Sequence, residues 1–287
     1  MNSRDPFDPR SSAPEAPEQV IRDLFVMSSG NRQVLRYHGR TGAFVGCVGE
    51  ADGDFTFGPG GDLFVARMAM NGQFDPHILR IDGTTGAEKG VFARCQAGNE
   101  GPAALKFGPD GNLYVKEYVH GCGDVLGRYQ AATGEYLGIV SKGFGFGEFA
   151  FGPDGDHYVP GRRQDTKTGA PKPFAGTGWA RQEPRSVSFG PDGNLYASIL
   201  APPQIVRFEA ETGADLGIFA SYPSLKRPLG ITFGPDDNLY VACYLSAKVF
   251  RFDGRTGAFL DLFVSAHSGH LKNPTFLKFA PAPRPQS

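Results

Sequence analysis

A nine-residue segment that returns along the chain constrains the fold more than any other feature. FGPDGNLYV occupies residues 107–115, FGPDGNLYA occupies 189–197 and FGPDDNLYV occupies 233–241. Each copy joins two apolar stretches through a turn of Gly, Pro, Asp and Asn, which are the residues that favour tight turns between strands. One such unit cannot bury its apolar face alone, so copies must stack against one another. The sequence therefore predicts a repeat architecture.

The spacing of the repeats indicates which architecture this is. The turn proline and a Thr-Gly marker recur at intervals of about 44 residues, a period typical of a four-stranded propeller blade. Alternating apolar residues within 229–264 predict all four strands of one blade. The recurring residues are Pro59, Pro109, Pro153, Pro191, Pro235 and Pro281, and Gly42, Gly86, Gly134, Gly169, Gly213 and Gly257.

The two ends of the repeat region supply complementary parts of one blade. Residues 24–48 carry strands two to four of the repeat, and residues 275–281 carry only a first strand. We therefore predict an all-β, six-bladed β-propeller of four-stranded blades, whose C-terminal strand joins the N-terminal blade and closes the ring. One propeller domain is expected over residues 20–281, between disordered Pro-rich tails at 1–19 and 282–287.

Composition narrows the class of partners. Net charge is −1, and 40% of the 287 residues are hydrophobic, as in a soluble globular protein. A basic surplus that would favour nucleic acid or an anionic membrane is absent from the sequence. The N-terminal residues lack the apolar core of a signal peptide, and the four cysteines form no CxxC pair. We expect a cytoplasmic protein with free thiols, and neither nucleic acid nor membrane as partner.

The repeat letters also carry a resemblance to known families. FGPDGNLYV, VLRY at 34–37 and TGAFL at 256–260 resemble NHL-type six-bladed propellers and are similar to the related gluconolactonase (senescence-marker) and streptogramin-lyase groups. The resemblance covers residues 20–281 and implies the fold, with a lactonase, other hydrolase or lyase activity. It also implies a divalent cation, Ca, Mg, Mn or Zn. NEGP at 99–102 resembles the first ligand segment of the gluconolactonases, so Glu100 would be a metal ligand.

The innermost strands carry a second, non-repeated pattern. Residues two apart share a face of a strand, and the face opposite the repeated phenylalanines is mostly polar. We expect it to line the axial channel, with Asp54 and Glu148 nearer the variable loops. One interpretation is a wet channel in which two acids balance Lys106 and Lys278. The other is a charged pocket floor, in which the acids are catalytic and the lysines bind a small polar ligand or a cation.

The loops between strands two and three and the links between blades share one face, and their lengths vary. Variable loops on a rigid scaffold are where binding residues usually lie. The candidates on this loop face are His77, His120, Trp179, Arg185, His267 and His270. His267 or His270 could form an acid–base pair with Glu148. His120, Cys122 and His77 could instead hold zinc. Solvated loop histidines are the structural alternative.

Two functions from different classes fit these features. The first is a small-molecule-binding propeller with its site on the loop face over the axial channel, acting as a lactonase, another hydrolase or a lyase. The second is a non-enzymatic module that docks a protein or peptide on the same face. A polar funnel around Asp54 and Glu148 would favour the first, and an apolar patch around Phe144, Phe146 and Trp179 would favour the second.

Overall fold

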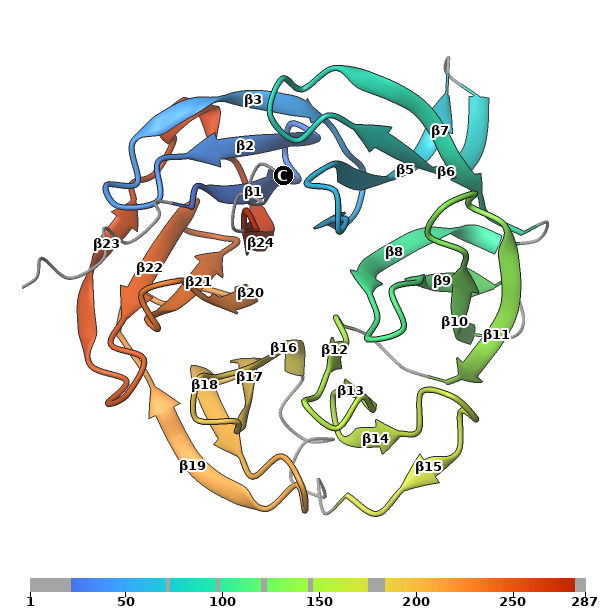
Figure 1. Cartoon of the computed structure of the whole chain (residues 1–287). Coiled ribbons are helices and arrows are strands. Elements are labelled where there is room, and N and C mark those ends of the chain that lie inside the picture. The colour runs from blue at the N-terminus through green and yellow to red at the C-terminus, as the bar shows by residue number, and fades with distance from the viewer. Residues whose placement is uncertain are drawn as a thin grey trace, which may run out of the picture.

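Six antiparallel sheets of four strands stand as blades in a ring around a central axis (Figure 1). The structure, a computed structural model, describes residues 22–70, 73–96, 99–119, 123–143, 147–174 and 184–281. The predicted six-bladed all-β propeller is confirmed. Within these ranges the only helical element is the 3-10 turn η2 (Ser268–His270), and no helix is long and apolar enough to cross a membrane.

Each blade runs from an innermost strand at the axis to an outermost strand at the rim. In that order the strands are β24 (Pro274–Phe279), β1 (Leu24–Ser28), β2 (Gln33–Tyr37) and β3 (Phe44–Glu50); β4 (Phe55–Phe57), β5 (Leu63–Met70), β6 (Gln73–Ile81) and β7 (Glu88–Arg94); β8 (Asn99–Phe107), β9 (Leu113–Val119), β10 (Gly123–Tyr129) and β11 (Tyr136–Lys142); β12 (Ala150–Phe151), β13 (His157–Val159), β14 (Arg162–Gln164) and β15 (Pro171–Lys172); β16 (Pro184–Phe189), β17 (Leu195–Leu200), β18 (Pro203–Phe208) and β19 (Asp215–Ala220); and β20 (Pro228–Phe233), β21 (Leu239–Cys243), β22 (Lys248–Phe252) and β23 (Phe259–Val264).

The ring is closed by the C-terminal strand, as the ends of the repeat region predicted. β24 pairs antiparallel with β1, with Val26 opposite Leu277 and Leu24 opposite Phe279. Leu277 is only 3% exposed and belongs to the same apolar cluster as Leu24 and Val26. The first blade is therefore assembled from both ends of the chain, and its innermost strand has a partner only when the ring closes.

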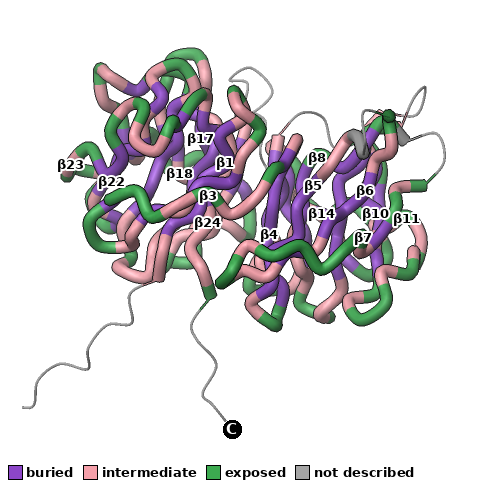
Figure 2. Tube along the Cα trace, turned by 90° about the horizontal axis from the view of Figure 1, so that it is seen from above, coloured by how far each residue is buried: buried purple, intermediate pink, exposed green. Residues whose placement is uncertain are grey.

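Aromatic pairs between neighbouring blades form the core. In each pair, an aromatic side chain from the second strand of one blade meets a phenylalanine from the first strand of the next blade, edge to face. The pairs are Phe25–Phe57, Phe64–Phe107, Tyr114–Phe151, Tyr158–Phe189, Tyr196–Phe233 and Tyr240–Phe279. Burial follows the inner strands, and the outermost strands β3 and β7 are largely exposed (Figure 2). The repeated phenylalanines of the first strands therefore form the inter-blade core.

The third-strand arginines pair with aspartates of their own blades. Arg80 lies 2.6 Å from Asp62, and Arg207 lies 3.7 Å from Asp192. Tyr196 donates to the same Asp192 at 3.0 Å. The aspartate of the repeated turn is thus held by an arginine and a tyrosine of its blade. Its recurrence at Asp110, Asp154, Asp192 and Asp236 therefore has a structural cause.

Candidate functional site

The candidate site lies at the axis, where the inner strands bring four charged side chains within electrostatic reach of one another. Asp54, Lys106, Glu148 and Lys278 come from four different blades, and the charges of Asp54 and Lys106 act on the pKa values of both Glu148 and Lys278. We call these four residues the axial charge cluster. They face the axis because alternate residues of each inner strand point away from the inter-blade core. The polar channel predicted from the sequence is therefore present.

Asp54 is fully buried and connects three blades. Its carboxylate accepts hydrogen bonds from the backbone N–H of Phe55 at 2.8 Å and of Leu105 at 3.0 Å. It also forms an ion pair with Lys278, whose Nζ lies 2.5 Å away. These three contacts hold the Asp54 carboxylate within the protein. Asp54 lines neither of the two axial cavities described below.

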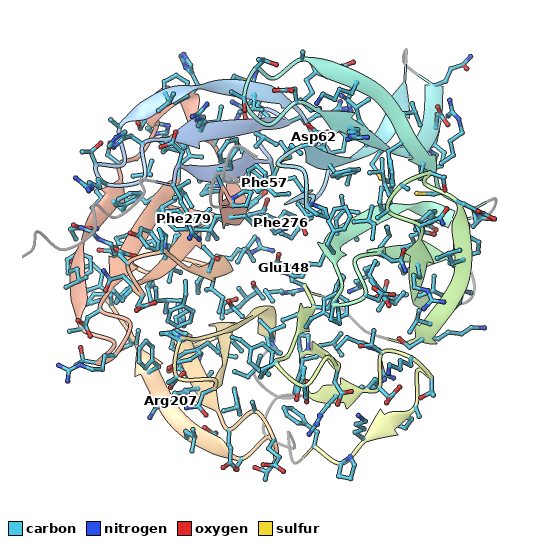
Figure 3. The ribbon with its side chains drawn as sticks, in the orientation of Figure 1. Phe57, Asp62, Glu148, Arg207, Phe276 and Phe279 are labelled. Atoms are coloured by element: carbon cyan, nitrogen blue, oxygen red, sulfur yellow. The ribbon has the colours of Figure 1, made fainter. Side chains whose placement is uncertain are left out.

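Glu148 lies near the axis at the entrance to β12 (Figure 3). Its side chain is 5% exposed, and its carboxylate accepts a hydrogen bond from the Ser186 hydroxyl. Burial raises its pKa, the Lys106 charge opposes that rise, and the Asp54 charge adds to it. The net result is a carboxyl group whose pKa lies above the ordinary value, which makes it a stronger base than a solvated glutamate.

A cavity of about 370 Å³ opens above Glu148, and we call it the loop-face cavity. Small-molecule sites commonly have volumes of this order. Its lining is mostly apolar, with cations and acids set into it. The lining residues are Ala103, Lys116, Tyr118, Asp124, Gly147, Glu148, Arg185, Arg227, Leu229, Thr275 and Phe276.

The cations of this cavity are held in different ways. Lys116 is buried, lies 3.2 Å from Asp124 and donates to the carbonyl oxygen of Gly147 at 3.0 Å. Burial lowers the pKa of Lys116, and the Asp124 charge opposes that change. Arg227 is exposed, with its guanidinium 5.2 Å from the ring centre of Tyr244. Arg185 enters from the start of β16. Positive groups therefore surround one buried carboxylate.

A second cavity of about 440 Å³ lies at the opposite end of the channel, and we call it the turn-face cavity. Lys106 and Lys278 line it together with residues of the GP turns such as Gly234 and Pro235. We expected both lysines to contribute to a ligand site on the loop face. The structure places them on the other face, because each stands two residues further along its inner strand than the position equivalent to Glu148.

The predicted histidines are not brought to Glu148. His77 is 2% exposed, lies within β6 and has its Nδ1 2.6 Å from the backbone oxygen of Asp75. His267 and His270 flank and end η2, a turn that packs against the outer strand β3. None of the three lines either axial cavity. Their catalytic and binding roles stay predictions, and an acid–base pair with Glu148 has no geometric support.

A metal site finds little support among the described residues. They contain no group of three or more His, Cys, Asp or Glu side chains placed to hold an ion. Glu100, the ligand implied by the resemblance, is exposed on β8 and does not line the loop-face cavity. His120, Cys122 and Trp179 lie outside the described residues, as do Phe144 and Phe146.

Three lining residues were missed by the sequence reasoning: Lys116, Asp124 and Arg227. A signal for Lys116 existed. It stands in the second strand where other blades have Ala66, Ser198 and Ala242, so a charge interrupts a small, buried position of the repeat. Arg227 and Asp124 stand in segments that differ between blades, and only the folded ring shows which of those segments reach the axis.

One buried pair has the residue types of a nucleophile and base but lacks access. Ser141 Oγ lies 3.0 Å from Nε2 of His157, which also contacts Gln164 at 3.0 Å. His157 is fully buried, and burial lowers its pKa. It occupies the position of Leu113 and Leu195 in the third and fifth blades. The pair therefore fills the core of the fourth blade, whose third strand is only three residues long.

The fold is a six-bladed propeller, and solved structures with similar folds are known. The periplasmic gluconolactonase of Pseudomonas aeruginosa superposes with a TM-score of 0.59 at 17% identity, covering 92% of this chain and 100% of that one. The virginiamycin B lyase of Staphylococcus aureus gives 0.57 at 18% identity, covering 82% and 78%. A protein of unknown function from Bacteroides caccae gives 0.68 at 14% identity, covering 90% and 98%.

These likenesses are structural. No family model matches the chain, and no curated protein matches it. At identities below a fifth, the similarity shows the fold and leaves the chemistry to the residues of the cavity. The NHL label stays a prediction.

Proposed function

We propose that the loop-face cavity binds a small, polar, anionic molecule and that the protein hydrolyses a lactone there, with Glu148 as the general base. The observation that carries the proposal is a buried carboxylate with a raised pKa on the wall of a cavity of about 370 Å³, beside Arg185 and Arg227. A carboxyl group with a shifted pKa on the wall of a cavity is a candidate for an active-site residue.

The reaction follows from the positions of these groups. Glu148 takes a proton from a water molecule, and the water oxygen attacks the carbonyl carbon of the lactone. The bond between that carbon and the ring oxygen then breaks, and the ring oxygen receives the proton that Glu148 holds. The two arginines stabilise the negative charge that develops on the carbonyl oxygen or bind an anionic substituent. Atoms and charges balance without a cofactor.

The names of the structural neighbours support this reaction class. One is a gluconolactonase, and another is a lyase. A lyase would use the same base to remove a proton from carbon, so elimination is the second candidate. The lactone is preferred because arginines beside the base suit a developing oxyanion.

A panel of sugar-acid lactones, with and without a carboxylate or phosphate substituent, tests the proposal. Acid release is followed at constant pH for the wild-type protein and for E148Q. Loss of a general base lowers kcat by about 10² to 10⁴. E100Q, which removes an exposed acid of the neighbouring blade, is the matched control and should keep full activity. Equal rates in E148Q and wild type would refute the role of Glu148.

The second candidate function is a non-enzymatic module that docks a protein or peptide on the loop face. The aromatic residues expected to form its surface, Phe144, Phe146 and Trp179, lie outside the described residues. It becomes the better account if no lactone of the panel is hydrolysed or bound.

A further inference from the structure

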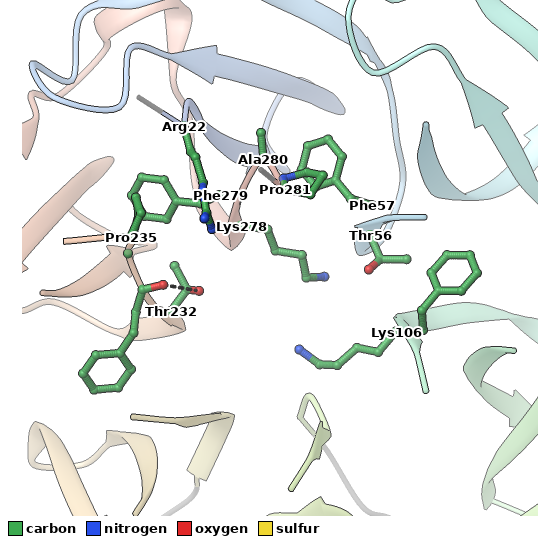
Figure 4. Close-up of a pocket in the computed structure, with 13 residues that line it drawn as sticks. Arg22, Thr56, Phe57, Lys106, Thr232, Pro235, Lys278, Phe279, Ala280 and Pro281 are labelled. Atoms are coloured by element: carbon green, nitrogen blue, oxygen red, sulfur yellow. Dashed lines mark hydrogen bonds between the residues drawn. The ribbon is translucent and has the colours of Figure 1, made fainter. Parts of the chain in front are cut away.

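The turn-face cavity, on the opposite side of the ring from the loop-face cavity, has no part in the function proposed above. It has a volume of about 440 Å³ and lies at the mouth of the axial channel (Figure 4). Arg22 and Pro281, the first and last described residues, both line it. Its walls include the Phe57 and Phe279 side chains. The cavity therefore forms where the two ends of the described chain meet, and its surface is both polar and apolar.

The lining of this cavity carries three positive groups, Arg22, Lys106 and Lys278. None of its lining residues in the described part of the chain is an acid. The ammonium groups of Lys106 and Lys278 extend into the mouth of the channel from the third and first blades (Figure 4). The carboxylate of Asp54 balances Lys278 from behind, which leaves an excess of positive charge toward the mouth.

The donors in this cavity are poorly satisfied by the protein. Across the described ranges, Lys106 Nζ makes neither a hydrogen bond nor an ion pair, and Nε of Arg22 is buried without a partner. The hydroxyl of Thr232 reaches only the carbonyl oxygen of Phe233, at 3.5 Å. Buried donors without acceptors are costly, and like charges in one cavity repel. Both penalties would be relieved by an anion with several acceptor oxygens.

The charges also disturb one another in the direction that a bound anion would correct. Burial lowers the pKa of Lys278, and the nearby Lys106 charge lowers it further against the effect of Asp54. An anion between the two ammonium groups would favour the charged form of Lys278. A compact oxyanion suits the geometry, because phosphate and carboxylate groups accept several charge-assisted hydrogen bonds at once.

We propose that the turn-face cavity is a second ligand site, which binds a compact oxyanion group, phosphate or carboxylate, through Lys106, Arg22 and Lys278. The threonine hydroxyls of Thr56 and Thr232 stand beside the same space as further donors. The volume leaves room for an organic remainder against the phenylalanine side chains. This site has its own cavity and lining residues, and the proposal does not require that the lactone site be correct.

Isothermal titration in Tris chloride at fixed ionic strength tests the site, with inorganic phosphate in one arm and succinate in the other. The wild-type chain should bind one equivalent of at least one of these anions saturably, with no response to added chloride. The arm with the tighter binding identifies the oxyanion. Absence of saturable binding in both arms would overturn the proposal.

Variants locate the binding. K106M should weaken it at least tenfold, K106R should restore most of it, and K142M, which removes an exposed lysine of β11, should leave it unchanged. R22Q gives a second reading that does not depend on the folding of K106M, because the Arg22 Nε has no internal partner to lose. E148Q, which should lose lactone hydrolysis, should still bind one equivalent of the anion saturably, which separates this site from the lactone site. Unchanged binding in both K106M and R22Q would exclude the cavity.

Discussion

Replacement of Asp54 by alanine tests the axial charge cluster most strongly. Asp54 is fully buried, accepts hydrogen bonds from two backbone N–H groups and forms an ion pair with Lys278. D54A leaves the Lys278 ammonium without its counter-charge and the Leu105 N–H without an acceptor. Breaking a buried ion pair from one side typically destabilises a protein by about 3–5 kcal/mol.

The destabilisation by D54A can be measured as a change in the free energy of unfolding or in Tm. Urea unfolding, monitored by far-UV circular dichroism, should show a loss of about 3–5 kcal/mol in the free energy of unfolding. For a domain of this size, that loss corresponds to a fall in Tm of roughly 6–12 °C. E211A, which removes an exposed carboxylate, should change the free energy by less than about 0.5 kcal/mol.

A double-mutant cycle separates the ion pair from the backbone contacts. D54A/K278M removes both charges, so it should be more stable than the sum of the two single changes predicts, by about 1–3 kcal/mol. The Leu105 N–H remains without an acceptor in both D54A backgrounds, so recovery is incomplete. If D54A unfolds within about 1 kcal/mol of wild type, the reasoning that Asp54 ties three blades together is refuted.

Three further results are expected. L277A truncates a side chain that is 3% exposed in the closing strand and should cost about 2–5 kcal/mol, measured by urea unfolding; an unchanged midpoint would contradict ring closure through β24. Burial raises the Glu148 pKa above its ordinary value of 4.5, so wild-type stability falls as pH rises through that value toward the folded one. E148Q, which cannot ionise, should match wild type near pH 4 and be more stable at pH 7, and an equal difference at both pH values would argue against a raised pKa. K106M removes the cation that most favours ionised Glu148, so the acidic limb of the rate profile should move to higher pH; a limb that stays in place would show that Lys106 does not act on Glu148.

The fold could be predicted because its determinants are local and repeated. Turn residues, alternating apolar residues and the phenylalanine of each first strand are written into nearly every blade, and the structure uses them alike in each. Ring closure followed from the complementary ends of the repeat region. These features need only the period and the pattern.

The site was predicted in part, for a physical reason. Glu148 faces the axis, as its place opposite the core phenylalanines requires, and it meets Arg185 there. The partner of Asp54 is Lys278, which lies 224 residues away and becomes a neighbour only after the ring closes. No repeat pattern specifies such a pairing.

The surroundings of the loop histidines could not be predicted from the sequence. His267 and His270 lie in the link that carries the chain to β24, and that position suggested access to the axis. Their left-handed backbone angles, with φ of 64° and 65°, shape the short turn η2, which is held by the Tyr37 hydroxyl on the Ser268 carbonyl oxygen. That bond directs the turn to the first blade. Backbone geometry of this kind cannot be read from residue types alone.

The pH dependence of kcat/KM for lactone hydrolysis tests whether Glu148 in the loop-face cavity is the catalytic base. The rate would be measured from pH 4 to pH 9, after subtraction of the uncatalysed reaction, for wild type and E148Q. The account predicts an acidic limb in the wild type with an apparent pKa above 4.5, which disappears together with most of the activity in E148Q. A limb that persists unchanged in E148Q, or hydrolysis that does not vary with pH, would contradict it.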